Sequence, residues 1–289
     1  MINTIKHLSY ILKSSPEELN KVIQNIDRYY YEKVEIKLNK DGSQKLDGKG
    51  NPKKRILNPS IGKLKHIQQM ILLHILDGIK LPDYAYGAIK GRDNVMNAKR
   101  HQGKKYIFTT DLKNFFPTIT HRMAFEMYRS LNFSPTVSRI LTQLTTYKGL
   151  LPQGAPTSPM MANLVFIKTG DKLDALSKQH KITFTTFIDD MTFSSAKDFK
   201  VLTSSFLAII TIDGFRISHN KTNYKTKNPV VTGAVVKNNN LSLTNSFKLK
   251  MNNTAGLSAN QIAGIQQYAN KVKAANKYLT VESVPHRHP

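Results

Sequence analysis

The stretch Phe184-Thr185-Thr186-Phe187-Ile188-Asp189-Asp190-Met191-Thr192-Phe193-Ser194 places two adjacent acids between two runs of apolar and β-branched residues. This pattern predicts a β-hairpin with a carboxylate pair at its turn. Neighbouring side chains on a strand point to opposite faces, so the two acids would not serve one ion equally, although at a tight turn at least one can face a cleft. Aspartate is also a common turn residue, so this stretch alone is equally compatible with a solvated turn.

A third acid, Asp111, follows an apolar run at residues 106–110 that predicts a buried strand. A carboxylate that closes such a strand is unfavourable unless something pairs with it. If two acidic strand ends lie side by side, three carboxylates meet and repel one another unless divalent cations neutralise them. Two Mg²⁺ ions roughly 3.5–4 Å apart can clamp the attacking and leaving oxygens of an in-line displacement. The acids therefore predict metal-assisted phosphoryl transfer.

The composition is strongly basic. Lysine and arginine number 43 against 19 aspartates and glutamates, so the formal net charge is 43 − 19 = +24 over 289 residues. A polyanion is the natural partner of such a chain, nucleic acid first and an anionic membrane second. The absence of cysteine excludes disulfides, thiolate metal sites and zinc fingers. The apolar patch at residues 8–12 is too short for a signal-peptide core, and the longest apolar run nearby is broken by His74 and Asp77, so we expect a soluble, cytoplasmic protein with no membrane partner.

Four segments resemble motifs of reverse transcriptases, in the family's order and spacing over about residues 50–236. Residues 187–190 resemble the Tyr-x-Asp-Asp motif, with Phe187 in place of tyrosine, and residues 111–116 resemble the first palm motif. The other two segments resemble the Gln-Gly-x-x-x-Ser-Pro motif and the motif after the catalytic hairpin; they are residues 151–159 and Gly214-Phe215 with Lys221-Thr222.

Two shorter segments narrow the resemblance to retron reverse transcriptases. Asn97-Ala98-Lys99-Arg100-His101 is similar to their Asn-Ala-x-x-His signature, and Val231-Thr232-Gly233 to their Val-Thr-Gly signature. The resemblance implies reverse transcription of a cognate structured noncoding RNA, primed from an internal guanosine 2′-hydroxyl, into single-stranded DNA that stays joined to RNA. It also implies a role in antiphage defence together with a separate effector protein.

The resemblance assigns catalytic roles. Asp111 and Asp189 would bind two Mg²⁺ ions, Asp190 would assist them, and Leu112 joins the set of metal-binding positions. Lys221 would act as general acid toward the leaving pyrophosphate, a role that suits a lysine whose pKa is lowered toward the working pH.

A second group of residues would contact the dNTP. Arg55 lies in a basic segment and could hold the triphosphate through its planar fork, although a solvated basic hairpin explains it nearly as well. By resemblance, the Phe116 ring would exclude a 2′-hydroxyl, while Gln153 and Gly154 would face the nucleotide and the template. An ordinary core aromatic is the competing interpretation of Phe116.

RNA specificity would come from the two signature segments and from the thumb at residues 237–289, which would bind the RNA or duplex. RNA duplexes are recognised mainly by shape and by their 2′-hydroxyls, so we assign binding of the cognate RNA to a small set of positions: Asn97, His101, Val231, Thr232 and Gly233. A lone histidine in a helix usually serves packing or lies at the surface, and only the resemblance raises His101 above that interpretation.

The expected fold is α/β, a right-hand polymerase with fingers at residues 1–104, palm at 105–236 and thumb at 237–289. Locally, Ser15-Pro16 predicts a capped helix start, and two short basic strands predict a ribbon around residues 33–59. We expect one long helix over residues 60–79, a hairpin of 230–236 with 241–243, and helix from about residue 246 with Leu257 on its apolar side.

Rivals remain within and outside this class. Group II intron enzymes normally carry a further maturase segment, and diversity-generating enzymes typically lack the Gln-Gly-x-x-x-Ser-Pro form. Another phage-defence reverse transcriptase is possible, and so is a catalytically silent RNA-binding scaffold. The scaffold would explain the charge but not the three intact acids.

Overall fold

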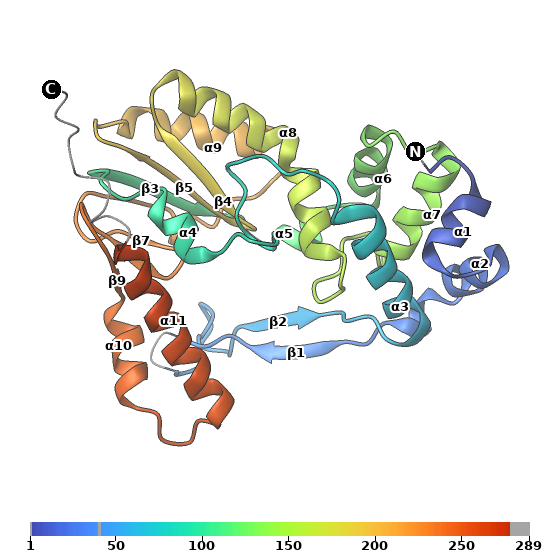
Figure 1. Ribbon diagram of the computed structural model, residues 1–289, viewed down its shortest axis with the longest axis horizontal. Coiled ribbons are helices and arrows are strands. Elements are labelled where there is room, and N and C mark those ends of the chain that lie inside the picture. Colours follow the sequence, from blue (N-terminus) through green and yellow to red (C-terminus); the bar gives the residue numbers. More distant parts are fainter. Residues whose placement is uncertain (1, 40–41, 278–289) are drawn as a thin grey trace, which may run out of the picture. The chain divides into compact units, whose positions relative to one another are not determined.

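The computed structural model describes residues 2–39 and 42–277, and their contacts divide the chain into two units (Figure 1). The first unit comprises residues 1–82, 113–170 and 213–216, and the second comprises 83–112, 171–212 and 217–289, so each is assembled from separate stretches of sequence. The division into fingers, palm and thumb stays a prediction.

The second unit is built on a four-stranded antiparallel sheet in the order β4-β5-β3-β6. The strands are β4 (Thr183–Phe187), β5 (Asp190–Ser195), β3 (Tyr106–Asp111) and β6 (Asn223–Lys225). Strands β4 and β5 are the two arms of the predicted hairpin, and β3 is the predicted strand that ends in an acid. Both predictions are confirmed.

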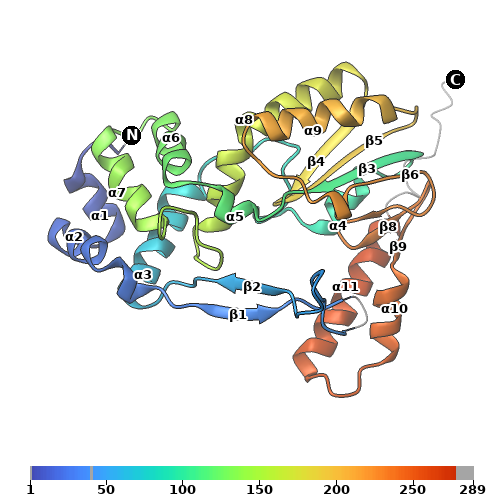
Figure 2. The same ribbon diagram turned by 180° about the vertical axis from the view of Figure 1, so that it is seen from behind.

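The two faces of this sheet are covered by different helices (Figures 1 and 2). Side chains alternate along a strand, so Phe193 points to one face and Ser194 to the other. Phe206 of α9 (Thr203–Ile212) stacks on Phe193 with ring centroids 4.2 Å apart. The opposite face is covered by α4 (Asn94–Lys99) and the turn that follows it, which reaches Ser194 through His101.

A smaller sheet in the same unit corrects the predicted hairpin of residues 230–236 with 241–243. The segment folds as two strands, β7 (Val230–Val231) and β8 (Ala234–Val236), and β8 pairs with β9 (Leu241–Leu243). Thr232 and Gly233 have φ of 42° and 93°, and this left-handed turn divides the predicted strand in two. The helices that follow are α10 (Asn245–Asn252) and α11 (Ala259–Lys277), so Leu257 lies in a connection rather than on a helix.

The first unit contains helices and the predicted ribbon, β1 (Lys33–Ile36) paired antiparallel with β2 (Lys54–Leu57). The predicted helix start is confirmed, because Ser15 and Glu18 form a reciprocal capping box at α2 (Pro16–Gln24). The predicted single helix over 60–79 is wrong in its bounds: α3 (Gly62–Ile71) passes into the π-helix η2 (Leu72–Leu76), and Ile61 is a 43 % exposed N-cap.

The two units also contain the helices α1 (Ile5–Leu12), η1 (Ile26–Tyr29), α5 (Phe115–Thr118), α6 (His121–Ser130), α7 (Pro135–Thr145), α8 (Ser158–Gln179), η3 (Lys200–Leu202) and η4 (His219–Lys221). Within the described ranges, no helix combines the length and the apolar character that a membrane crossing needs.

Candidate active site

The three acids converge at one end of the four-stranded sheet. Asp111 is the last residue of β3 and stands directly opposite Asp190, the first residue of β5. Residues paired in this way place their side chains on the same face. Asp189 occupies the preceding turn, where its carbonyl oxygen accepts a hydrogen bond of 2.9 Å from the Leu112 N–H. Backbone pairing thus fixes the relative positions of the three acids.

Lys221 joins the acids from η4. Its ammonium group donates to Asp111 Oδ2 at 2.6 Å, and Asp111 is only 4 % exposed. Burial alone would lower the pKa of Lys221, but the hydrogen bond with Asp111 and the charges of Asp190 and Asp189 outweigh it and raise the pKa. The shift is opposite to the one that would suit a general acid, so Lys221 is held charged as a partner of Asp111.

The convergence of the three carboxylates changes the pKa of Asp190. Partial desolvation of its carboxyl group, followed by the charges of Asp189 and Asp111, raises the pKa of Asp190 to about 7, while Lys221 acts in the opposite direction. The residue as a whole is exposed, so solvent screens part of this repulsion. The direction of the shift follows from three carboxylates held together by the sheet, and it indicates a site suited to an added cation.

The predicted dNTP contacts belong to the first unit. The Gln153 carbonyl accepts a 2.7 Å hydrogen bond from the Asn58 N–H, and Gly154 has φ of 107° with Pro59 packed against it. A Cβ at Gly154 would lie 3.4 Å from Pro59, so this loop needs glycine both for its conformation and for its close packing. Phe116 is half-buried beside Phe115, with ring centroids 6.0 Å apart.

Arg55 is exposed on β2 opposite Glu35. Gln153 and Gly154 lie against the segment that follows β2, whereas the three candidate catalytic acids belong to the second unit.

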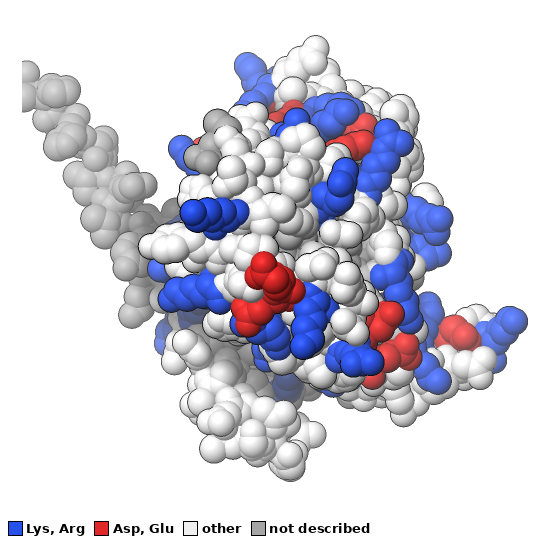
Figure 3. All heavy atoms as spheres, turned by 90° about the vertical axis from the view of Figure 1, so that its right-hand side faces the viewer, with Lys and Arg blue, Asp and Glu red and all other residues white. Residues whose placement is uncertain are grey.

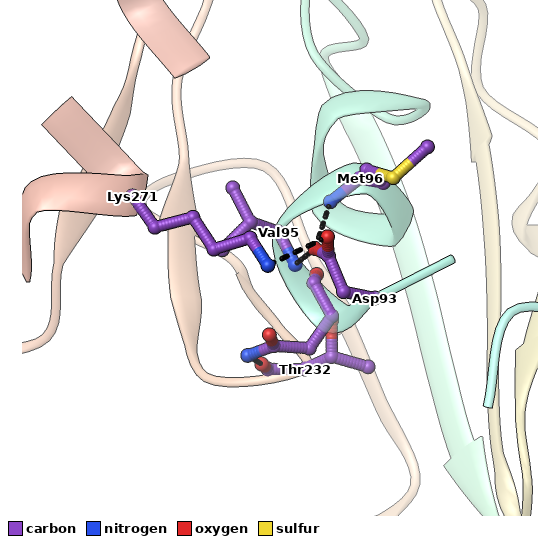
Figure 4. Close-up of polar contacts among 6 residues, drawn as sticks. Asp93, Val95, Met96, Thr232 and Lys271 are labelled. Atoms are coloured by element: carbon purple, nitrogen blue, oxygen red, sulfur yellow. Dashed lines mark hydrogen bonds and ion pairs between the residues drawn. The ribbon is translucent and has the colours of Figure 1, made fainter. Parts of the chain in front are cut away.

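The two signature segments are in contact with each other. The Asn94 amide donates to the Thr232 carbonyl at 2.9 Å, the Asn97 amide donates to the Thr232 hydroxyl at 3.3 Å, and that hydroxyl donates to the Asn94 carbonyl at 2.8 Å. Figure 4 shows this junction, where Asp93 also caps α4 and pairs with Lys271 of α11 at 2.9 Å. Sequence reasoning missed Asn94, whose only signal was its place directly after the capping residue.

Burial limits what these segments can touch. Asn97, His101 and Val231 are at most 1 % exposed, so their side chains offer almost no surface to an RNA in this arrangement. Gly233 is exposed, and Thr232 is half-buried. Binding of RNA near this junction stays a prediction, and it would have to use the backbone and exposed neighbours rather than the three buried side chains.

Comparison with known proteins agrees with this geometry. The family described as reverse transcriptase (RNA-dependent DNA polymerase) matches residues 38–239, more than half of the chain. The retron Ec86 reverse transcriptase of Escherichia coli is 32 % identical over 77 % of this chain and 67 % of its own length. The chain belongs to the retron-type reverse transcriptases. The predicted family and fold class are confirmed.

Two further relatives extend the same pattern. The retron Se72 enzyme of Salmonella heidelberg (strain 579083-10) is 31 % identical over 68 % of this chain and 49 % of its own length. The retron Mx162 enzyme of Myxococcus xanthus is 32 % identical over 63 % of this chain and 44 % of its own length. This chain thus spans about two thirds of one relative and less than half of the other two. Reverse transcriptases are RNA-directed DNA polymerases, nucleotidyltransferases that generally use an RNA template and dNTPs.

Reverse transcriptases generally use divalent metal ions, and the donor chemistry of this retron-type enzyme fits them. Asp111, Asp189 and Asp190 offer hard carboxylate oxygens, and Leu112 can offer its backbone carbonyl. Among residues 2–39 and 42–277, no three acidic, histidine or cysteine side chains form a complete ion site. Mg²⁺ usually takes one or two carboxylates and completes its shell with water and substrate phosphates, so a partial protein site is what this ion needs.

Basic side chains are spread over the one face of this retron-type enzyme that is drawn in Figure 3. Figure 3 shows Lys and Arg side chains distributed across the visible face, with smaller groups of Asp and Glu among them. A distributed positive surface attracts a nucleic-acid backbone without specifying its sequence.

Proposed function

We propose that this enzyme reverse-transcribes a cognate structured noncoding RNA, primed from a guanosine 2′-hydroxyl, into single-stranded DNA that remains linked to RNA. We further propose that it does so in antiphage defence with a separate effector protein, in the cytoplasm. Support comes from the retron reverse transcriptases that it resembles and from the acids at the end of its sheet.

One observation carries the polymerase assignment. Asp111 and Asp190 are paired across adjacent strands, and Asp189 occupies the turn between β4 and β5. Their mutual repulsion would be an unexplained cost in a protein that only binds RNA. A silent RNA-binding scaffold has no need of this arrangement, so the acids favour the enzyme.

In the proposed mechanism, Asp111 and Asp189 would hold two Mg²⁺ ions, with help from Asp190 and the Leu112 carbonyl. When bound, the ions stabilise the attacking and leaving oxygens of the phosphoryl transfer. The sheet keeps the acids in place, and Lys221 balances the charge of Asp111 between turnovers. From its position beside the acids, Lys221 can also donate a proton toward the pyrophosphate once the negative charge around it is neutralised.

The other assignments extend the same proposal. Gln153 and Gly154 would contact the nucleotide and the template, the Phe116 ring would exclude ribonucleotides, and Arg55 would hold phosphate. Residues 1–104, 105–236 and 237–289 would act as fingers, palm and thumb. Phe187 keeps the aromatic ring of the usual tyrosine and lacks its hydroxyl, so we expect activity to be retained.

The test is incorporation of dNTPs on a generic RNA template with a DNA primer, comparing the wild-type protein with Asp189→Ala. We expect synthesis by the wild type only. The nucleic acid that copurifies with the protein expressed from its native locus should contain a discrete DNA. This DNA should shorten slightly with RNase and keep a branched RNA remnant. Synthesis by Asp189→Ala contradicts the catalytic assignment, and active protein without branched DNA favours another phage-defence reverse transcriptase.

A further inference from the structure

The face of the sheet that carries the catalytic acids continues away from them as a row of hydroxyl side chains. On β5, Asp190 and Ser194 are four residues apart and point to the same face. On β4, Thr185 lies on this face as well, two residues before Phe187, which pairs with Asp190. Thr185 and Ser194 are 1 % and 0 % exposed, so their hydroxyl groups need partners inside the protein.

His101 provides a partner for both. One ring nitrogen lies 2.7 Å from Ser194 Oγ and the other 2.7 Å from Thr185 Oγ1, so the ring spans the two strands that lead into the catalytic turn. Burial, with a smaller contribution from Arg100, lowers the pKa of His101 to about 3. The ring is therefore neutral at physiological pH, with one nitrogen donating and the other accepting.

The backbone around His101 is itself held in place. Its N–H donates to the Ala98 carbonyl at 3.1 Å, at the end of α4. The start of α4 is capped by Asp93 and bonded to Thr232 through Asn94. His101 thus connects the catalytic hairpin to a helix that is fixed at its other end.

We propose that His101 is a positioning residue for the catalytic acids, which acts by holding β4 and β5 in register through Thr185 and Ser194 rather than by contacting RNA. The inference rests on the proposed polymerase function and assigns to the last residue of the Asn97–His101 signature a role in nucleotide addition. A misplacement of about 1 Å in a catalytic constellation can cost on the order of a hundredfold in rate. A side chain that never touches substrate can therefore control kcat.

The experiment compares His101→Leu, which removes both hydrogen bonds, with His101→Gln, whose amide can still donate and accept. Steady-state incorporation on a generic primer and template gives kcat and the KM for dNTP, and filter binding gives the Kd for the copurifying RNA. For His101→Leu we expect kcat to fall by about ten- to a hundredfold, with KM and Kd unchanged. Partial recovery of kcat in His101→Gln is the second expected result.

Two outcomes overturn the inference. One is a wild-type kcat in His101→Leu, and the other is a loss of RNA affinity as large as the loss of kcat, which would return His101 to RNA recognition. If His101→Leu does not fold, Thr185→Val and Ser194→Ala make the same test, because each removes one of the two hydrogen bonds. Lowered kcat in both supports the role of His101, and wild-type kcat in both overturns it.

The wild-type protein is assayed first, because the two proposals fail differently. A wild type that incorporates no dNTP contradicts the polymerase function and the positioning role together. An active wild type with an unaffected His101→Leu contradicts the positioning role alone.

Discussion

The two ends of β3 meet opposite environments. Near its start, Ile107 belongs to a buried apolar cluster with Val95, Val231 and other residues of α4, β7–β9 and α11. At its far end, Asp111 stands beside Asp190 and depends on Lys221 for charge balance. At the first end, the side chains are packed against other apolar side chains of the protein. At the second end, the carboxylates repel one another, and this repulsion favours binding of a cation. The signature segments lie at the first end, and the catalytic acids lie at the second.

The largest effect of a mutation is expected at the end of β3 that carries Asp111. Asp111→Asn keeps the shape of the side chain and removes its charge, so we expect nucleotide incorporation to fall by on the order of 10²–10³-fold or more. Stability should change little, because the relieved repulsion with Asp190 offsets the lost ion pair with Lys221. Incorporation assays and urea unfolding measure the two effects. Glu126→Gln, on an exposed surface pair with Arg122, is the control and should change neither. Full activity in Asp111→Asn would contradict the site.

The buried end should respond in stability first. Gly233 has φ of 93°, and an added Cβ would lie 3.3 Å from the Tyr268 hydroxyl oxygen. We expect Gly233→Ala to lower the free energy of unfolding by about 1–3 kcal/mol. Gly264→Ala, at an exposed position of α11 where no atom lies within 4 Å of the added Cβ, is the matched control and should raise it by about 0.5–1 kcal/mol. Equal effects in urea unfolding would show that the Thr232–Gly233 turn is not constrained.

The buried end should also be sensitive to acid through His101. The pKa of His101 is about 3 in the folded protein, below its ordinary value of 6.5, so below pH 6.5 the unfolded state binds more protons. Stability is fully present above pH 6.5 and is lost as pH falls, by about 2 kcal/mol at pH 5. His101→Gln should lose less stability than the wild type between pH 7 and pH 5. If urea unfolding shows that the wild type and His101→Gln lose the same free energy of unfolding between pH 7 and pH 5, His101 is not buried in its neutral form.

The smallest effect is expected at the edge of the junction. Asp93→Asn keeps an N-cap for α4 and removes the ion pair with Lys271, which is half-exposed. The free energy of unfolding should fall by about 0.5–1 kcal/mol at low salt and by less at high salt, because salt screens exposed pairs. Lys271→Met should lower the free energy of unfolding by the same amount as Asp93→Asn. A loss that does not depend on salt would mean that Asp93 acts through the cap alone.

Much of the site could be predicted because its signals are local. Asp111, Asp189 and Asp190 each sit at the end of an apolar run, and alternation along strands makes both the strands and their ends predictable. The capping box at Ser15 was likewise predictable, since its partners are three residues apart. The errors fell where a distant contact or an unusual backbone conformation decides, as at the π-helix after Ile71 and the turn at Thr232.

By itself the sequence determined the family, the fold class and the three candidate catalytic acids, because these depend on residue type and spacing. Only the tertiary structure decided which groups His101 and Asn97 contact. A histidine's role depends on which groups surround its two nitrogens, and here those are hydroxyls some ninety residues away in sequence. The structure also decided the direction of the pKa shift of Lys221, which the sequence could not show, because the pKa follows the balance between burial and neighbouring carboxylates, and that balance exists only once the chain has folded.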